Sequence, residues 1–316
     1  MPYSTGLLYN LFMHKLVILS QQETQYRSLV EQARLPDLII ESTLTPEIDI
    51  VLGEPSRIKA ALGSLPALSW VQSIWAGVEP LLDSALRRDY ILTNARGVFG
   101  ELMSEYVIGY LLAHERKIFQ RHEAQQNKYW EDSDTGTLRG KTIGLLGVGS
   151  IGAEVALTAK FFGMNVRGYT LSTETSGHVD EYFHGNKLLD FANGLDYLVN
   201  ILPNTKDTRK IVNADVLDSL PPHALFINVG RGSAVDESAL IEALNQNRIA
   251  GAVLDVFEQE PLPKEHSFWT TPNLIMTFHT AAPSLAEDIT NIFIENYELF
   301  NKNKSLKYQV DFEKGY

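Results

Sequence analysis

The sequence predicts an α/β protein that contains two doubly wound parallel sheets. Short apolar runs alternate with helix-like stretches along nearly the whole chain, which is the pattern of parallel strands joined by helices. The length of 316 residues indicates about two domains. A glycine-rich turn stands between an apolar run and a helix-like stretch near the middle of the chain. Together these observations favour one α/β domain on each side of that region.

The first third of the chain is predicted to form one of the sheets. Its helix-like stretches include 22–33 and 56–62. Because the apolar runs between such stretches are short, they favour strands with helices on both faces of the sheet. The expected strands are 16–19, 38–40, 48–52, 70–74 and 90–93.

A long helix is expected over 101–126. Its apolar residues cover more than one side, and a helix that is apolar on two sides is buried on two sides. It therefore lies either between domains or against another subunit. We expect a homodimer, since a two-fold interface is the commonest closed arrangement.

The second sheet is expected to start after Lys141, with helices at 151–162, 215–220 and 237–245. A last amphipathic helix is predicted over 284–300. Ser284 and Glu287 have the spacing of a capping box, with Pro283 just before them. The expected strands of this sheet are 142–146, 165–169, 197–202, 225–229, 252–256 and 274–277.

Composition narrows the function classes. The chain has 39 acidic and 27 basic residues, a formal net charge of −12, and no basic stripe. This balance argues against a nucleic-acid partner. Cysteine is absent, which excludes disulfides, thiolate metal sites and cysteine nucleophiles, and we predict no metal in the site.

The amino-terminal region is predicted to be an extension, residues 1–12, ahead of the first strand. The apolar stretch 6–19 has no basic cluster before it and no small-residue cleavage site after it, so it does not resemble a signal peptide. It is also too short to span a membrane as a helix. We therefore expect a cytoplasmic protein without a membrane partner.

The glycine-rich turn is the strongest local motif. Gly147, Gly149 and Gly152 directly follow the predicted strand 142–146 and open the next helix. In a dinucleotide-binding turn these positions allow the tight turn, the approach of the pyrophosphate and close helix packing. The N–H groups at the start of that helix, including Ser150 and Ile151, favour phosphate. We predict a Rossmann-like dinucleotide site here.

The residue that reads the cofactor's ribose is expected at the end of the second strand of this domain, about 20 residues further on. Thr170 occupies that place, where sites that prefer NAD usually have a carboxylate. Hydroxyls at Ser172 and Thr173 favour a phosphate, whereas Glu174 opposes one, and no Arg or Lys lies between Thr170 and Gly177. The balance favours a site that takes NADH and NADPH, with a modest lean to NADPH.

Three segments further along the chain carry candidate catalytic groups. They are an Arg between glycines in 228–232, an acidic loop with two prolines in 255–263, and a His after a strand in 278–282. Taken singly, each has a simpler interpretation: a surface Arg, a solvated loop and a structural His.

Together with Trp75-Ala76-Gly77-Val78 and 138–152, these segments resemble the D-isomer-specific 2-hydroxyacid dehydrogenase family. The resemblance covers nearly the whole chain from about His14, and the glyoxylate and hydroxypyruvate reductases are the most similar branch. It implies NAD(P)H-dependent reduction of a small 2-oxo acid to the D-2-hydroxy acid by hydride transfer. It also implies a substrate-binding domain of 13–104 and 284–316, a dinucleotide-binding domain of 105–283, and an active-site cleft between them.

The resemblance assigns three catalytic roles. Arg231 would hold the substrate's carboxylate and carbonyl oxygens, which suits a planar guanidinium. His279 would be the general acid and base at the C2 oxygen. Glu260 would pair with His279 and raise its pKa, because a nearby anion favours the imidazolium.

The remaining roles are also implied by the resemblance. Backbone groups of Ala76 and Gly77 would contact the substrate carboxylate, and Asp255 the nicotinamide carboxamide. Residues expected to line the cofactor cleft are Leu202, Pro203, Val229 and Gly230. Residues expected to shape a small, partly apolar substrate pocket are Leu52, Trp75 and Met103.

The sequence departs from the family at Thr170 and at Phe278, where the family usually has Pro before the catalytic His. The main alternative is a dinucleotide-sensing regulator, similar to the corepressors built on this scaffold. A dehydrogenase of formate or phosphite is a further alternative. Because Arg231, Glu260 and His279 are all present, the enzyme is the favoured interpretation.

Overall fold

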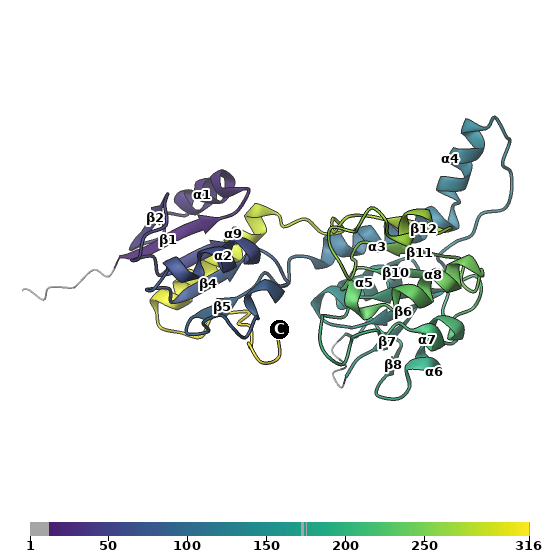
Figure 1. The fold of residues 1–316 in the computed structure, drawn as a ribbon. Helices are drawn as coiled ribbons and strands as arrows, with labels where there is room; N and C mark the ends of the chain where they lie inside the picture. The colour runs from purple at the N-terminus through teal and green to yellow at the C-terminus, as the bar shows by residue number, and fades with distance from the viewer. Residues whose placement is uncertain (1–12, 172–173, 175, 316) are drawn as a thin grey trace, which may run out of the picture. The chain divides into compact units, whose positions relative to one another are not determined.

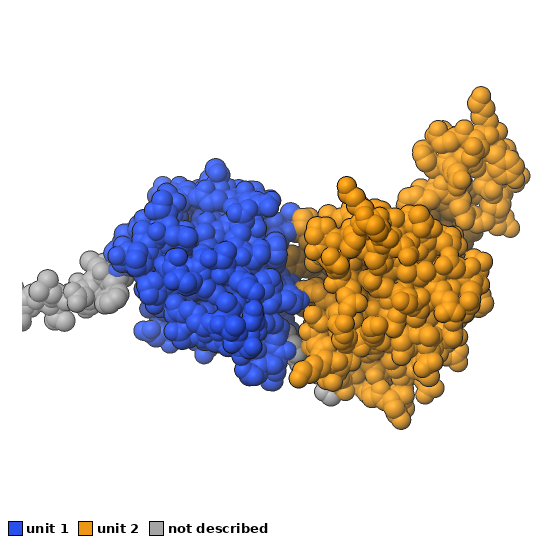
Figure 2. All heavy atoms as spheres, in the orientation of Figure 1, with its two compact units in different colours: residues 1–98, 284–316 blue, residues 99–283 orange. Residues whose placement is uncertain are grey.

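A computed structural model describes residues 13–171, 174 and 176–315. The predicted extension 1–12 and the two hydroxyl residues Ser172 and Thr173 lie outside this description. The chain divides into two compact units, residues 1–98 with 284–316 and residues 99–283 (Figure 2). The division falls between Val98 and Phe99, and the expected boundary after residue 104 lies inside helix α3 (Gly100–Glu115).

Unit 1 contains a parallel sheet of five strands in the order β2-β1-β3-β4-β5. Its strands are apolar and mostly buried, as the sequence predicted. Trp70 and Phe293 stack with ring centroids 5.1 Å apart, which fixes helix α9 on the sheet. The elements are β1 (His14–Leu19), α1 (Glu23–Gln32), β2 (Leu38–Glu41), β3 (Ile50–Gly53), α2 (Pro55–Ala61), β4 (Trp70–Ser73), β5 (Ile91–Thr93) and α9 (Ala286–Asn301), with 3₁₀ turns at Leu62–Ser64 and Glu79–Leu81.

The start of α9 differs from the expected capping box. The helix begins at Ala286, after Leu285, and no side chain caps it. Ser284 Oγ instead donates a hydrogen bond to the carbonyl of Ile74, 2.9 Å away. The predicted capping pair of Ser284 and Glu287 is therefore wrong, because the hydroxyl finds its acceptor at the end of β4.

Unit 2 contains a parallel sheet of seven strands in the order β12-β11-β10-β9-β6-β7-β8 (Figure 1). The strands are β6 (Thr142–Leu146), β7 (Asn165–Tyr169), β8 (Glu181–Phe183), β9 (Tyr197–Asn200), β10 (Leu225–Asn228), β11 (Gly251–Leu254) and β12 (Leu274–Met276). The helices besides α3 are α4 (Ile118–Gln126), α5 (Ser150–Phe161), α6 (Leu188–Ala192), α7 (Ala214–Ser219) and α8 (Glu237–Asn245), with 3₁₀ turns at Gly232–Ala234 and Ser267–Thr270.

Apolar side chains cover both faces of this sheet. Ile143 and Leu145 of β6 join the core that contains residues of α3 and α5, whereas Leu146 joins the core under α6, α7 and α8. Side chains alternate along a strand, so a strand buried on both faces is apolar throughout. This confirms the predicted doubly wound architecture. The sequence analysis did not predict β8 and α6.

The long helix expected over 101–126 is two helices. Lys117 has a φ of +53°, which ends the first helix and starts α4 at Ile118. Helix α3 is deeply buried, but within the described helix α4 no residue is buried, and Ile118 and Phe119 are each 52% exposed. Figure 1 shows α4 standing away from the rest of unit 2. Of the apolar residues in 101–126, only those of α3 therefore contribute to the hydrophobic core.

None of the helices in the described part of the chain is long and apolar enough to cross a membrane. The cytoplasmic location stays a prediction.

Candidate active site

The residues predicted to bind the cofactor gather at one edge of the seven-stranded sheet. Because the strands are parallel, the loops that follow them leave the sheet at the same, carboxyl edge, where ligands bind in folds of this kind. The residues at this edge are Gly147, Gly149, Ser150, Ile151 and Gly152 after β6, Thr170 after β7, Leu202 and Pro203 after β9, Val229 and Gly230 after β10, Asp255 after β11 and His279 after β12.

The glycine turn has the geometry that a dinucleotide needs. Gly147 has a φ of +97°, and a Cβ on Gly152 would lie 2.3 Å from the carbonyl oxygen of Gly147. A Cβ on Gly149 would meet no described atom within 4 Å beyond its chain neighbours. The backbone at Gly149 is therefore open to a ligand, directly before the first turn of α5. These features fit a bound pyrophosphate.

Glu260 and His279 form a direct pair. Glu260 Oε2 lies 2.8 Å from His279 Nδ1, and Glu260 Oε1 accepts the N–H of Phe257 at 2.9 Å. The hydrogen bond to Glu260 raises the pKa of His279, against burial and the charge of Arg231. Burial alone would raise the pKa of Glu260, but the bonds from His279 and Phe257 hold it below its ordinary value. The pair therefore favours an imidazolium beside a carboxylate.

Arg231 belongs to the same cluster. Its charge lowers the pKa of both His279 and Glu260. The Arg231 loop is packed closely on the acidic loop, since a Cβ on Gly232 would lie 1.8 Å from the carbonyl carbon of Phe257. Thus the three groups that the sequence separates by up to 48 positions act on one another in the structure.

Asp255 holds the loop that carries His279. Its side chain is 2% exposed, and its carboxylate accepts bonds from Thr277 Oγ1 at 2.5 Å, Thr280 N at 2.8 Å and Ala281 N at 3.1 Å. Its carbonyl oxygen accepts the N–H of His279 at 2.7 Å. His279 has a φ of +57°, which is rare for a residue with a side chain, so these bonds fix a strained conformation. The contact with nicotinamide stays a prediction.

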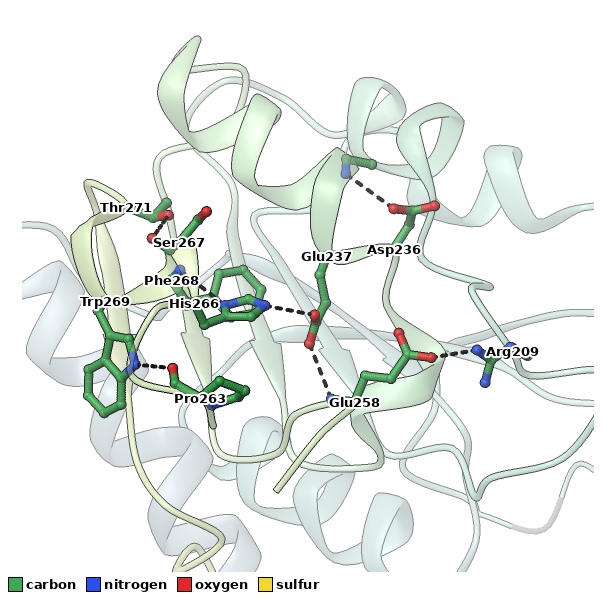
Figure 3. A network of polar contacts seen from close by, with 11 residues as sticks. Arg209, Asp236, Glu237, Glu258, Pro263, His266, Ser267, Phe268, Trp269 and Thr271 are labelled. Carbon is green, nitrogen blue, oxygen red and sulfur yellow. Dashed lines mark hydrogen bonds and ion pairs between the residues drawn. The ribbon is translucent and has the colours of Figure 1, made fainter. Parts of the chain in front are cut away.

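The acidic loop is fastened to the start of α8 (Figure 3). Glu237 accepts the N–H of Glu258 at 3.2 Å and lies 3.2 Å from His266 Nε2. Glu258 also pairs with Arg209, and Trp269 Nε1 donates to the carbonyl of Pro263 at 2.8 Å. The sequence analysis did not single out Glu237 and His266. Their hydrogen-bond partners depend on the packing of the acidic loop against α8, which the sequence does not show.

The predicted substrate residues of unit 1 lie at the end of β4. Trp75 is 41% exposed, and its backbone bonds to Ser73 Oγ, while Asn94 Nδ2 donates to the carbonyl of Ala76 at 2.7 Å. These bonds shape the 75–77 turn. Leu52 is 0% exposed within β3, so its predicted place in the lining of a pocket is wrong.

A family model for the NAD-binding domain of D-isomer specific 2-hydroxyacid dehydrogenases matches residues 108–281, more than half of the chain. The chain belongs to this family. This 2-hydroxyacid dehydrogenase is therefore an NAD(P)-dependent oxidoreductase. The family, fold class and enzyme class predicted from the sequence are confirmed.

Relatives of this dehydrogenase are similar over most of its length. Glyoxylate/hydroxypyruvate reductase A of Serratia proteamaculans is 34% identical over 229 residues, which cover 70% of this chain and 72% of the relative. A family protein from Aeromonas salmonicida has a solved structure with a TM-score of 0.91, at 40% identity, covering 95% of this chain and 99% of that one. A family protein from Xanthobacter autotrophicus Py2, solved with NADPH and MES, has a TM-score of 0.85 at 31% identity, covering 96% and 100%.

Proposed function

We propose that this dehydrogenase reduces small 2-oxo acids of the glyoxylate and hydroxypyruvate type to D-2-hydroxy acids, with NADPH or NADH. The observation that carries the proposal is the His279–Glu260 bond of 2.8 Å, with the charge of Arg231 acting on both partners. A proton donor beside a carboxylate-binding guanidinium suits a 2-oxo acid. The name of the Serratia relative supports the choice of substrate.

The proposed chemistry divides between cofactor and chain. The bound cofactor supplies a hydride to C2 of the substrate. His279 uses Nδ1 for Glu260, so Nε2 is the nitrogen that gives a proton to the C2 oxygen. The raised pKa of His279 keeps that proton available near neutral pH. Arg231 would hold the substrate's carboxylate and carbonyl oxygens, which suits its planar guanidinium.

Each unit is assigned its own ligand contacts in this proposal. Unit 2 would hold the cofactor through the 147–152 turn, Thr170, and the residues after β9, β10 and β11. In unit 1, the backbone N–H groups of Ala76 and Gly77 would bind the substrate's carboxylate. The lean to NADPH is supported by the Xanthobacter relative, whose structure contains NADPH.

We also propose a homodimer in which a second copy covers α4 and the segment after it. Ile118 and Phe119 at the start of α4 are each 52% exposed, and Tyr129 and Trp130 in the segment after α4 are 64% and 85% exposed. Large apolar side chains that gather on one exposed segment indicate an interaction surface.

A substrate screen tests the proposed function. Purified enzyme is mixed with glyoxylate, hydroxypyruvate or pyruvate and NADPH or NADH, and separately with formate and NADP⁺ or NAD⁺, and the change in nicotinamide absorbance is followed. We expect turnover of glyoxylate or hydroxypyruvate, with NADPH used at least as well as NADH. If both dinucleotides bind but no 2-oxo acid is reduced, the protein is instead a dinucleotide-binding regulator.

A further inference from the structure

His184 lies at the place where the cofactor's ribose is read. Strand β8 pairs in parallel with β7, with Tyr169 opposite Phe183, so Thr170 and His184 follow side by side at the carboxyl edge of the sheet. Strand β7 in turn pairs with β6, which leads into the glycine turn. His184 directly follows β8, which the sequence analysis did not predict, and the only local signal for this strand is the short aromatic run Tyr182-Phe183.

The contacts of His184 require a protonated ring. Its Nδ1 lies 3.0 Å from the carbonyl oxygen of Thr170 and 3.3 Å from Thr170 Oγ1, and its Nε2 lies 2.9 Å from Glu174 Oε1. A carbonyl and a carboxylate only accept hydrogen bonds, whereas a neutral imidazole has one N–H. Both bonds form together only when both ring nitrogens carry a proton.

The charged groups around His184 support this state. The hydrogen bond to Glu174, followed by the bond to the Thr170 backbone, raises the pKa of His184, while Lys187 opposes it. The ring of Tyr182 lies parallel to that of His184, with centroids 6.3 Å apart. His184 is 34% exposed and Glu174 57% exposed, so both side chains are within reach of a ligand.

We propose that His184 binds the 2′-phosphate of NADP, and that Glu174 holds the imidazolium until the phosphate replaces it. This rests on the proposed function, in which the chain binds NAD(P). In a fold of this kind the adenosine ribose lies at the end of the second strand, which here is Thr170. No Arg or Lys lies between Thr170 and Gly177, and His184 provides a positive charge directly after the neighbouring strand β8. The exchange replaces one charge-assisted hydrogen bond by another.

Direct binding tests the proposal without turnover. Dissociation constants for NADP⁺ and NAD⁺ are measured by titration calorimetry on wild type, His184→Gln and the control His223→Gln. His223 pairs with Asp196 at 3.1 Å, before β9 at the amino edge of the same sheet. We expect His184→Gln to weaken NADP⁺ about tenfold and to leave NAD⁺ unchanged, with no effect of His223→Gln. An unchanged dissociation constant for NADP⁺, or an equal loss of affinity for both dinucleotides, overturns the role of His184 and leaves the proposed function standing. Failure of wild type to bind either dinucleotide overturns the proposed function as well.

Two further arms of the same experiment guard against a folding defect. A 2′-phosphate has its second pKa near 6, so above pH 7 it gains only the last small part of its second negative charge and cannot itself cause a loss of affinity. Between pH 7 and 9.5, wild type should lose NADP⁺ affinity relative to NAD⁺ as His184 loses its proton, and His184→Gln should not.

The second arm uses Glu174→Gln, which removes the carboxylate that competes with the phosphate. At pH 6.5 this variant should bind NADP⁺ about threefold more tightly than wild type. A flat wild-type ratio, or weaker NADP⁺ binding by Glu174→Gln, contradicts the proposal.

Discussion

Glu260 holds His279 by Nδ1 at 2.8 Å and fixes its own position through the N–H of Phe257. One carboxylate oxygen bonds to His279, and the other accepts the backbone N–H of Phe257 in the acidic loop. The orientation of the ring and the charge that favours its protonation therefore come from the same residue. The change Glu260→Gln removes the charge but keeps a side chain that can hold the ring.

Removing the imidazole should remove the proton donor. We expect His279→Ala to lower kcat by ~10²–10⁴, the usual contribution of general acid and base catalysis. Steady-state reduction of glyoxylate and hydroxypyruvate measures it, with His223→Ala as a control that removes a surface histidine of the same unit. Near-normal turnover by His279→Ala would contradict the assignment.

Glu260→Gln should shift the pH profile. Reduction needs the imidazolium, so kcat/KM falls as pH rises through the pKa of His279. The carboxylate raises that pKa, and its removal moves the falling limb to lower pH. Profiles of kcat/KM against pH for wild type, Glu260→Gln and the control Glu258→Gln test this. A falling limb that stays in place shows that Glu260 is not coupled to the proton donor.

Asp255→Asn should weaken both stability and catalysis. The amide has one acceptor where the buried carboxylate has two, so an N–H of Thr280 or Ala281 loses its partner. An unsatisfied buried group costs about 2 kcal/mol of unfolding free energy. Urea unfolding and kcat are measured together, with Thr277→Val as a variant that loses the hydroxyl bonds to Asp255 and Tyr106 but leaves the N–H groups of Thr280 and Ala281 paired. Wild-type stability in Asp255→Asn would rule out the proposed clamp on the His279 loop.

Thr170→Asp should move the cofactor preference toward NADH. A carboxylate at this position repels a 2′-phosphate, and such repulsion is smaller at an exposed rim than in a desolvated site. The ratio of kcat/KM for NADPH over NADH is compared between wild type and mutant. A wild-type ratio far below one refutes the lean to NADPH, whereas an unchanged ratio in the mutant shows that Thr170 does not read the ribose.

Helix α4 and the segment after it should be needed for assembly. At 35.4 kDa per chain, sedimentation at micromolar concentration should show a dimer for wild type. Ile118→Lys with Phe119→Lys should favour the monomer, because charges replace apolar contacts at the proposed interface. Leu189→Lys changes an exposed apolar residue on α6 and should leave the dimer intact. A wild-type monomer would contradict the homodimer.

The sequence by itself determined the order and type of most elements, because their apolar periodicity is local. The predicted bounds of β6, β7 and α8 agree with the structure. The glycine turn was also predictable from the sequence. Gly147, Gly149 and Gly152 each stand where the backbone of that turn requires a residue without a side chain. The segments around Arg231, Glu260 and His279, taken together with Trp75-Ala76-Gly77-Val78 and 138–152, were sufficient for the family resemblance.

The tertiary structure decided which groups meet, because hydrogen-bond partners depend on strand register and loop packing rather than on local pattern. The break at Lys117 divides a stripe that looked continuous. Ser284 bonds to Ile74 instead of capping its own helix. Asp255 reaches the loop of His279 only because β11 and β12 are neighbours, and His184 reaches Thr170 only because β8 pairs with β7. These contacts join residues that are distant in sequence, so no window of the chain contains them.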